Sequence, residues 1–271
     1  MLRAFFLLVL LLSPLSSQAL TYPKEKLRPI TAKSFLVMEP KGEVILEKNA
    51  DAVQPIASIT KLMTAMVVLD AEQNLDEEVV INHKLKSKYH SRLPSSVKTL
   101  SRHTLLNLAL VKSDNLAAYT LCDKYPGGVD SCVRAMNAKA ASMQLTNTHY
   151  TDPTGLDPEN VSTARELAQL VIQASNYKHI TDASGMPLVS IKVKKRWWQF
   201  GNTNPLVRKS DNIRVSKTGY INSSGGCLVM LADTEVGERV IVLLNSRSTR
   251  TRIPEAERIA VTVSHNDIDV D

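Results

Sequence analysis

The sequence predicts an α/β (α+β) protein in which strands from both ends of the chain form one antiparallel sheet flanked by helices. Three observations predict this class. Two apolar runs around a turn occupy residues 33–51, helical periodicity dominates the middle of the chain, and three strand-like runs follow Ile191. Short turns containing Gly join these last runs, which favours antiparallel pairing.

The elements can be placed in chain order from their periodicity. The first hairpin turns at "EPKGE", and an apolar helix begins near Ser58. Helical patterns follow in "TLSRHTLLNLALVKS", "NLAAYTLCDKYPGG", "DSCVRAMNAKAASM" and "TARELAQLVIQASN", strands in "NIRVSKTGYI", "GCLVMLAD" and "RVIVLLNS", and a last helix in "PEAERIAVTVS". We therefore expect a single domain over residues 20–271, with a helical lobe inserted at about residues 75–190.

The N-terminus has the pattern of a secretory signal peptide over residues 1–19. Arg3 precedes a short apolar stretch, and the small residues Ser17 and Ala19 follow it as a cleavage pair. Because this stretch is too short to span a bilayer stably, we expect cleavage after Ala19. The mature chain should then be soluble and periplasmic, without a transmembrane anchor. Its net charge of +6 fits a solubilising surface, and it also allows attraction to an anionic polymer.

Export makes the three cysteines relevant, because disulfides persist in oxidising compartments. Cys122 and Cys132 are close in sequence, and they could form a disulfide or remain two separate thiols. Cys227 lies in the apolar run "GGCLVML", so we expect a buried thiol on a strand.

Lys61 is the one charged residue in the apolar run "PIASITKLMTAMVVL". Ser58 precedes it by three residues, so both side chains lie on one helical face. The surrounding residues are apolar on nearly every side, and burial lowers the pKa of a lysine. A neutral amine beside a hydroxyl is a nucleophile with its base.

The S-x-x-K spacing alone is weak evidence, because the chain has three copies. Ser95 with Lys98 and Ser175 with Lys178 share the spacing, and both look like solvated surface. Only the Ser58 copy opens a strongly apolar helix.

Two later segments could complete a site with Ser58. Ser113 and Asn115 lie in "VKSDNLAAY", where the simplest structural role of the polar cluster is a helix N-cap. The tripeptide from Lys217 to Gly219 occurs once, near the end of a predicted strand. There Lys217 and Thr218 could bind an anion, and Gly219 could let a substrate approach the backbone.

The order S-x-x-K, S-D-N and K-T-G is the signature of class A β-lactamases and penicillin-binding proteins. The chain resembles the penicillin-recognising serine D-alanyl-D-alanine peptidases in these three motifs. The resemblance extends to the segments "TDPTGLDPEN", "STARELAQL", "NTNPLV" and "SKTGYINSSGGCLVMLA". The resemblance is greatest to the penicillin-binding protein 7 type of endopeptidase and runs from about Lys33 to Ile259. It implies the β-lactamase/transpeptidase-like fold.

The resemblance also implies roles for individual residues. Ser58 would be the nucleophile, Lys61 its general base and Ser113 a proton relay. The N–H groups of Ser58 and Tyr220 would form the oxyanion hole. The substrate-binding residues would be Asn115, Lys217, Thr218, Gly219, Tyr220 and Arg252, with Arg250 as the rival of Arg252 for the substrate carboxylate.

The substrate implied is the peptide stem of peptidoglycan, with β-lactams as covalent inhibitors. An endopeptidase would cut the D-Ala–diaminopimelate cross-link, whereas a carboxypeptidase would trim pentapeptide stems, and the resemblance favours the endopeptidase. A β-lactamase needs a deacylating glutamate in an E-x-x-L-N context, which is absent: Glu159 lies in "DPENV" and Glu166 in a helical pattern. An inactive penicillin-binding sensor domain would usually lack one of the chemical groups.

One basic and aromatic stretch, "KVKKRWWQFGN" around Lys195 to Trp198, finds no place in this function. We expect a loop or edge strand with Trp197 or Trp198 packed inward, and the alternative is a surface that grips glycan or shapes the groove. The sequence predicts no metal, cofactor or nucleic-acid partner, because no such ligand spacing or motif occurs.

Overall fold

The computed structural model describes residues 30–235 and 237–264, so the predicted signal peptide lies outside the described residues. At its centre is an antiparallel sheet with the strand order β2-β1-β11-β10-β9. The strands are β1 (Ser34–Met38), β2 (Val44–Lys48), β9 (Ile213–Ile221), β10 (Gly225–Thr234) and β11 (Gly237–Ser246). The N-terminal hairpin thus joins the C-terminal strands through β1 and β11, which confirms the predicted fold class.

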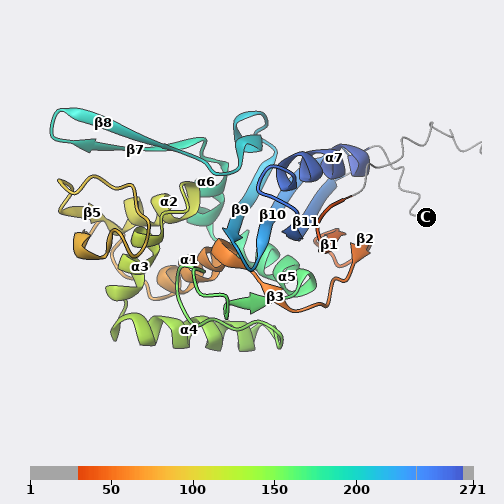
Figure 1. Ribbon diagram of the computed structural model, residues 1–271, viewed down its shortest axis with the longest axis horizontal. Coiled ribbons are helices and arrows are strands. Elements are labelled where there is room, and N and C mark those ends of the chain that lie inside the picture. Colours follow the sequence, from red (N-terminus) through yellow and green to blue (C-terminus); the bar gives the residue numbers. More distant parts are fainter. Residues whose placement is uncertain (1–29, 236, 265–271) are drawn as a thin grey trace, which may run out of the picture.

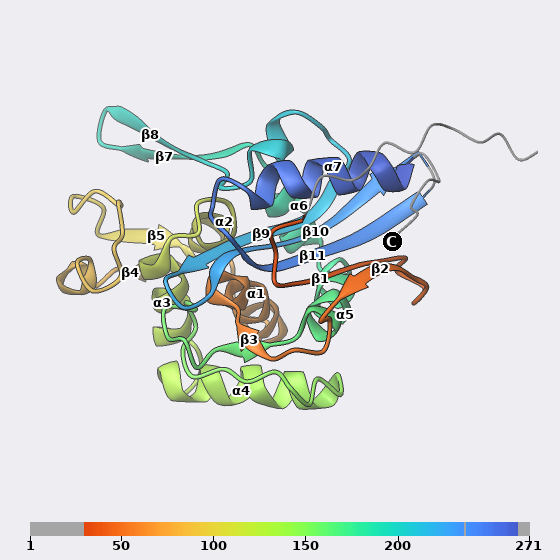
Figure 2. The ribbon, with the colours of Figure 1, turned by 45° about the vertical axis from the view of Figure 1, so that its right-hand side comes forward.

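Both faces of this sheet are covered, because its central strands are apolar on both sides. On one face Val37 and Ile241 pack with the last helix, α7 (Arg252–Ser264). On the other face Leu36 and Val242 pack with α5 (Ala164–Ala174). Figure 2 shows α7 and α5 on opposite sides of the strands.

The helical part of the chain surrounds α1 (Thr60–Asp70). All residues from Thr60 to Val68 are buried, as the apolar run predicted. Its neighbours are the helices α2 (Arg102–Val111), α3 (Asn115–Asp123), α4 (Gly128–Ser142), α5 and α6 (Lys178–Gly185). Two small two-stranded ladders connect these helices, β3 (Gln54–Pro55) with β6 (Val161–Ser162) and β4 (Glu78–Val80) with β5 (Thr99–Ser101).

Two of the three cysteines form a disulfide and the third is a free thiol. A disulfide joins Cys122 on α3 to Cys132 on α4, with a Cα–Cα distance of 5.4 Å. It therefore links two consecutive helices of the helical part. Cys227 is a buried free thiol on β10, as predicted.

The basic and aromatic stretch forms a separate hairpin of β7 (Leu188–Val193) and β8 (Arg196–Gly201). It projects from the body of the molecule at the upper left of Figure 1. Trp197 is 64% exposed and Trp198 is 43% exposed, so the prediction that one of them packs inward is wrong. Both strands of the hairpin pack against α2.

Within the part of the chain that the structure describes, no helix has the length and apolar content needed to cross a membrane. Over the same residues, no cluster of three or more His, Cys, Asp or Glu side chains is arranged to hold a metal ion.

Candidate active site

Ser58 lies in a 3-10 turn, η1 (Ala57–Ile59), that connects β3 to α1. The helix itself begins at Thr60, two residues later than the predicted start near Ser58. Ala57 has a φ of +48°, outside the helical region, and residues 57–59 form a 3-10 turn ahead of the helix. The three-residue spacing still places the two side chains together, with 2.8 Å between Lys61 Nζ and Ser58 Oγ.

Two glycines allow other segments to close on this turn. A Cβ at Gly219 on β9 would lie 3.0 Å from the Ser58 nitrogen, and one at Gly155 would lie 1.9 Å from the Ala57 carbonyl oxygen. Gly155 also has a φ of +77°, a conformation that side chains other than glycine rarely adopt. The absent side chain of Gly219 therefore makes room for the Ser58 turn itself, besides any substrate.

Lys61 is completely buried, and its amine has three neighbours. Nζ lies 2.8 Å from Ser58 Oγ, 2.7 Å from Asn115 Oδ1 and 2.5 Å from the Thr154 carbonyl oxygen. The amide and carbonyl oxygens can only accept hydrogen bonds, whereas a serine hydroxyl can also donate one. A neutral amine has two N–H groups and one lone pair, so this set of neighbours fits a neutral Lys61 whose lone pair faces Ser58.

The electrostatic surroundings favour the same protonation state. Burial lowers the pKa of Lys61 from 10.5 to about 7, although the carboxylates of Asp152 and Asp114 oppose this shift. A substantial fraction of the amine is therefore neutral at neutral pH and able to accept a proton from Ser58.

Ser113 and Asn115 reach the site from the connection between α2 and α3. The side chain between them, Asp114, accepts a hydrogen bond from Ala117 N and is the N-cap of α3. Ser113 has a φ of +61°, a strained conformation that is found at functional sites. Asn115 contacts Lys61 through Oδ1 and donates to the Tyr89 carbonyl through Nδ2. Asp114 is therefore the predicted cap, while Asn115 contacts Lys61 and Ser113 contacts Lys217.

Lys217 approaches from β9 and completes a second lysine–serine pair. Its Nζ lies 2.8 Å from Ser113 Oγ and 2.8 Å from the Thr218 carbonyl oxygen. Burial lowers the pKa of Lys217 well below its ordinary value, and the charges of Lys61 and Arg252 add to this shift. An anionic substrate beside the two lysines would oppose that shift and favour a proton on Lys217.

The remaining predicted binding residues lie on the end of β9 or against it. Thr218 Oγ1 is 2.8 Å from Thr203 Oγ1, and the Tyr220 side chain is about half exposed. Arg252, at the start of α7, is 8% exposed and donates a hydrogen bond to the Gly219 carbonyl. Arg250 is exposed, and of the two rival arginines it is Arg252 that lies against the K-T-G strand.

The loop at residues 151–160 contributes contacts that the three sequence motifs do not predict. Asp152 Oδ1 accepts from Gly155 N, and Asn160 Oδ1 accepts from Thr151 N, so the loop is closed by its own side chains. Asn160 Nδ2 also donates to Thr60 Oγ1, which ties the loop to the start of α1. The family resemblance of the segment "TDPTGLDPEN" pointed to this loop. It could not point to Thr154, because Thr154 contacts Lys61 through its carbonyl oxygen, a group that every residue carries.

Neither glutamate considered for a β-lactamase mechanism serves the Ser58 site. Glu159 is exposed on the loop. The buried carboxylate of Glu166 accepts hydrogen bonds from Asn147 N at 2.8 Å and from Thr148 Oγ1 at 2.5 Å. Glu166 therefore holds another part of the helical region together.

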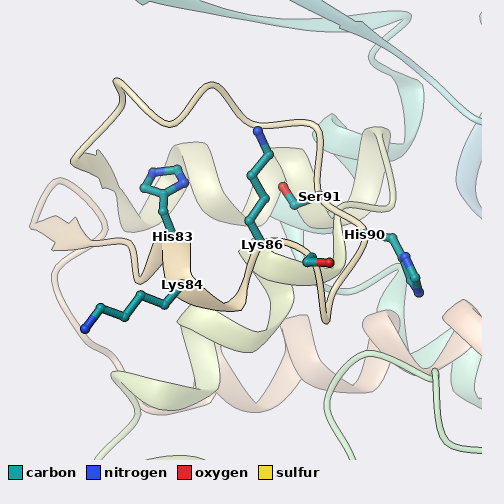
Figure 3. Close-up of a pocket in the computed structure, with 6 residues that line it drawn as sticks. His83, Lys84, Lys86, His90 and Ser91 are labelled. Carbon is teal, nitrogen blue, oxygen red and sulfur yellow. The ribbon is translucent and has the colours of Figure 1, made fainter.

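A cavity of about 490 Å³ lies beside this site without being part of it. Its lining residues are His83, Lys84, Lys86, Ser87, His90 and Ser91. In Figure 3 the side chains of Lys84 and His90 point away on opposite sides, so they do not converge on a common centre. Ser91 Oγ donates to Asp114 Oδ2, and none of the predicted catalytic residues lines the cavity.

Comparisons with known proteins agree with this arrangement. A D-alanyl-D-alanine endopeptidase of Pseudomonas aeruginosa is 40% identical over 224 residues, which are 80% of this chain and 72% of the relative. Among solved structures, the Streptomyces K15 DD-transpeptidase superposes with a TM-score of 0.79 and 27% identity, covering 86% of this chain and 96% of that one. The cefotaxime-bound penicillin-binding protein D2 of Listeria monocytogenes superposes with a TM-score of 0.73 and 28% identity, covering 86% and 96%.

A sequence model of one peptidase family, described as D-alanyl-D-alanine carboxypeptidase, matches residues 20–248. The match spans most of the chain and includes all three motifs. The chain therefore belongs to the D-alanyl-D-alanine carboxypeptidase family of serine peptidases.

Proposed function

We propose that the protein is an exported serine DD-peptidase that hydrolyses the D-Ala–diaminopimelate cross-link of peptidoglycan through an acyl-enzyme on Ser58. The observation that carries the proposal is the buried Lys61 amine, 2.8 Å from Ser58 Oγ and surrounded otherwise by acceptors. The family membership and the 40% identical endopeptidase support the reaction and its substrate.

Acylation begins when Ser58 Oγ attacks the carbonyl carbon of the penultimate D-Ala. The hydroxyl proton passes to the neutral amine of Lys61, and the carbonyl oxygen becomes an oxyanion. The backbone N–H groups of Ser58 and Tyr220 would stabilise this charge. The close approach of Gly219 to the Ser58 nitrogen supports that pairing, because Tyr220 is the next residue on β9.

Collapse of the tetrahedral intermediate breaks the C–N bond, and the leaving amine takes up a proton. The Lys217 amine, 2.8 Å from the Ser113 hydroxyl, supports a role for Ser113 in this relay. The relay returns the proton that Lys61 accepted to the leaving amine, and Ser58 is left as an ester. Water then attacks the ester carbonyl carbon and gives a proton to Lys61. The bond between that carbon and Ser58 Oγ breaks, Lys61 passes the proton to Ser58 Oγ, and the peptide acid is released.

The substrate backbone and carboxylate would be held by residues on both sides of Ser58. Asn115 could bind the peptide backbone from the helical part. Lys217, Thr218 and Arg252 lie along β9 or against it, and they offer cationic and hydroxyl groups to a carboxylate. Arg252 is preferred to Arg250 for this role because it contacts the Gly219 carbonyl.

β-Lactams would acylate the same serine, and the cefotaxime-bound relative supports this expectation. The predicted signal peptide supports a periplasmic location, where peptidoglycan is found. Incubation with a labelled penicillin tests the first claim. The expected result is a long-lived adduct on the Ser58 peptide, whereas rapid turnover would indicate a β-lactamase and absence of labelling an inactive domain.

A carboxypeptidase that trims pentapeptide stems is the second candidate, because the family description names that activity. Both reactions use the same acyl chemistry and differ only in the leaving group. Digestion of separated cross-linked and uncross-linked muropeptides distinguishes them. We expect cross-linked dimers to become monomers. Release of free D-Ala from pentapeptides with cross-links left intact would contradict the endopeptidase assignment.

A further inference from the structure

The β7–β8 hairpin is attached directly to the catalytic strand. Asn202 N donates to the Pro187 carbonyl at 2.8 Å and closes the base of the hairpin. The next residue, Thr203, donates from its backbone to the Val111 carbonyl at the end of α2 and contacts Thr218 Oγ1 on β9. Whatever the hairpin binds is therefore held at a defined position relative to the K-T-G motif.

The two faces of the hairpin differ in character. Val189, Ile191 and Phe200 alternate along the strands on one face and are buried, which anchors the hairpin. The other face carries Leu188 at the base of the hairpin, and beyond it Ser190, Lys192, Trp197 and Gln199, with Ser190 paired to Gln199 and Lys192 to Trp197. We call the last four residues the outer face.

Trp197 is the most exposed large apolar residue in the described part of the chain, at 64%. Its cross-strand neighbour Lys192 has its Nζ 5.9 Å from the ring centroid, a cation–π contact that orients the indole. Most of the ring nevertheless stays accessible. A flat aromatic ring held on a strand, with Ser190 and Gln199 beside it, suits the apolar C–H face of a sugar ring and its hydroxyl groups.

The tip of the hairpin is strongly cationic. Lys192, Lys194, Lys195 and Arg196 lie within five residues, and the sequence has no Asp or Glu between Asp182 and Asp211. Among the residues that the structure describes, no carboxylate forms an ion pair with any of these four. This charge complements a polymer that bears carboxylates.

We propose that the hairpin binds the glycan strand of peptidoglycan, with Trp197 stacked on a sugar ring and the tip cations bound to stem-peptide carboxylates. The inference rests on the proposed function, which makes this polymer the substrate. A lipid surface is the weaker fit, because the exposed apolar side chains of the hairpin, Leu188, Trp197 and Trp198, are divided between its two faces among polar and cationic side chains and form no continuous apolar face to insert.

The test is co-sedimentation of the full-length mature protein with purified insoluble peptidoglycan sacculi. Prior acylation with benzylpenicillin blocks the catalytic site, so the sedimented fraction reports binding elsewhere. We expect Trp197→Ala to weaken binding about tenfold or more, and Trp197→Phe to retain most of it. The double variant Lys194→Gln/Lys195→Gln should weaken binding and flatten its salt dependence. Thermal denaturation checks that each variant is folded.

The matched control is Lys41→Gln/Lys48→Gln, which removes the same charge from exposed positions at the β1–β2 hairpin. This control should sediment like the parent protein. If it lost as much binding as Lys194→Gln/Lys195→Gln, the effect would depend on net charge alone, and the proposal would be overturned. Unchanged binding of Trp197→Ala would also overturn it. So would stronger, Trp197-dependent binding to phosphatidylglycerol vesicles than to sacculi. Failure of the parent protein to be acylated would instead refute the proposed function.

Discussion

The serine–lysine pairs at Ser58 and at Ser175 have the same spacing and opposite surroundings. Lys61 is completely buried and lies 2.8 Å from Ser58 Oγ. The Lys178 side chain is 83% exposed and binds Asp182, four residues away, while Ser175 Oγ donates to the Ile172 carbonyl. Spacing alone therefore does not bring the two side chains into contact.

The two pairs differ in burial, and burial changes the protonation state of a lysine. Removing water from around Lys61 lowers its pKa to about 7, which makes the amine a base at neutral pH. The third serine–lysine pair agrees with this, because the exposed Lys98 donates its hydrogen bond to the backbone carbonyl of Ser95 and not to the Ser95 hydroxyl. Four predictions test how far the comparison holds, ordered from the largest expected effect to the smallest.

Replacement of the serine should abolish penicillin labelling in the Ser58 pair and leave it unchanged in the Ser175 pair. Ser58→Ala removes the oxygen that would form the ester in the proposed mechanism, so labelling by a fluorescent penicillin should be lost. Ser175→Ala, the matched control, should be labelled like the parent protein. Labelling of Ser58→Ala would show that another residue is the nucleophile.

Replacement of the lysine should slow acylation without unfolding the protein. Loss of a general base reduces rates by about 10² to 10⁴, so Lys61→Ala should lose this much of the acylation rate constant while keeping its circular dichroism spectrum. Lys178→Ala should acylate at the parent rate. A fully active Lys61→Ala variant would contradict the assignment of Lys61 as the base.

The glycine behind the Ser58 turn gives the next test. A Cβ at Gly219 would lie 2.9 Å from the Ile56 carbonyl oxygen and 3.0 Å from the Ser58 nitrogen, so Gly219→Ala must displace the turn. We expect acylation to slow by about tenfold to a hundredfold, because small shifts of a nucleophile are costly. Gly185→Ala meets only a carbonyl at 3.7 Å and should acylate normally. Equal acylation rates in the two variants would show that the close approach of Gly219 to the Ser58 turn is not needed for acylation.

The smallest effect is expected at the exposed pair. The Lys178–Asp182 ion pair joins residues four apart on α6, and such pairs stabilise helices by about 0.3–0.5 kcal/mol. Lys178→Ala should therefore lower the free energy of unfolding in urea by no more than about 0.5 kcal/mol. A loss of several kcal/mol would mean that exposure is a poor guide to the role of this lysine.

Local sequence patterns predicted much of the fold and part of the site. The continuous apolar run predicted a buried α1, and apolar runs separated by turns predicted the β1–β2 hairpin and the last three strands. The contact between Ser58 and Lys61 could also be predicted, because it depends on helical spacing. The 3-10 turn could not, since helical spacing does not indicate the positive φ of Ala57, whose carbonyl packs closely against Gly155 of the loop at residues 151–160.

The long-range contacts were accessible only through the combination of motifs. Asn115 meets Lys61 across 54 residues of sequence, and no periodicity encodes that distance. The Thr154 carbonyl could not be found from side-chain identity at all. The exposure of Trp197 and Trp198 escaped prediction because apolar residues usually pack inward, whereas this hairpin extends beyond the helix that covers its base.

The central claim is that Lys61 is the base for Ser58 because it is neutral near pH 7. The direct measurement is the second-order rate constant for acylation by a β-lactam as a function of pH, with the folded state checked at each pH. A base works in its unprotonated form, so the rate should rise about tenfold per pH unit below the pKa, with a midpoint near 7, and then level. A rate independent of pH through neutrality, or one that still rises toward the ordinary lysine value of 10.5, would contradict the claim.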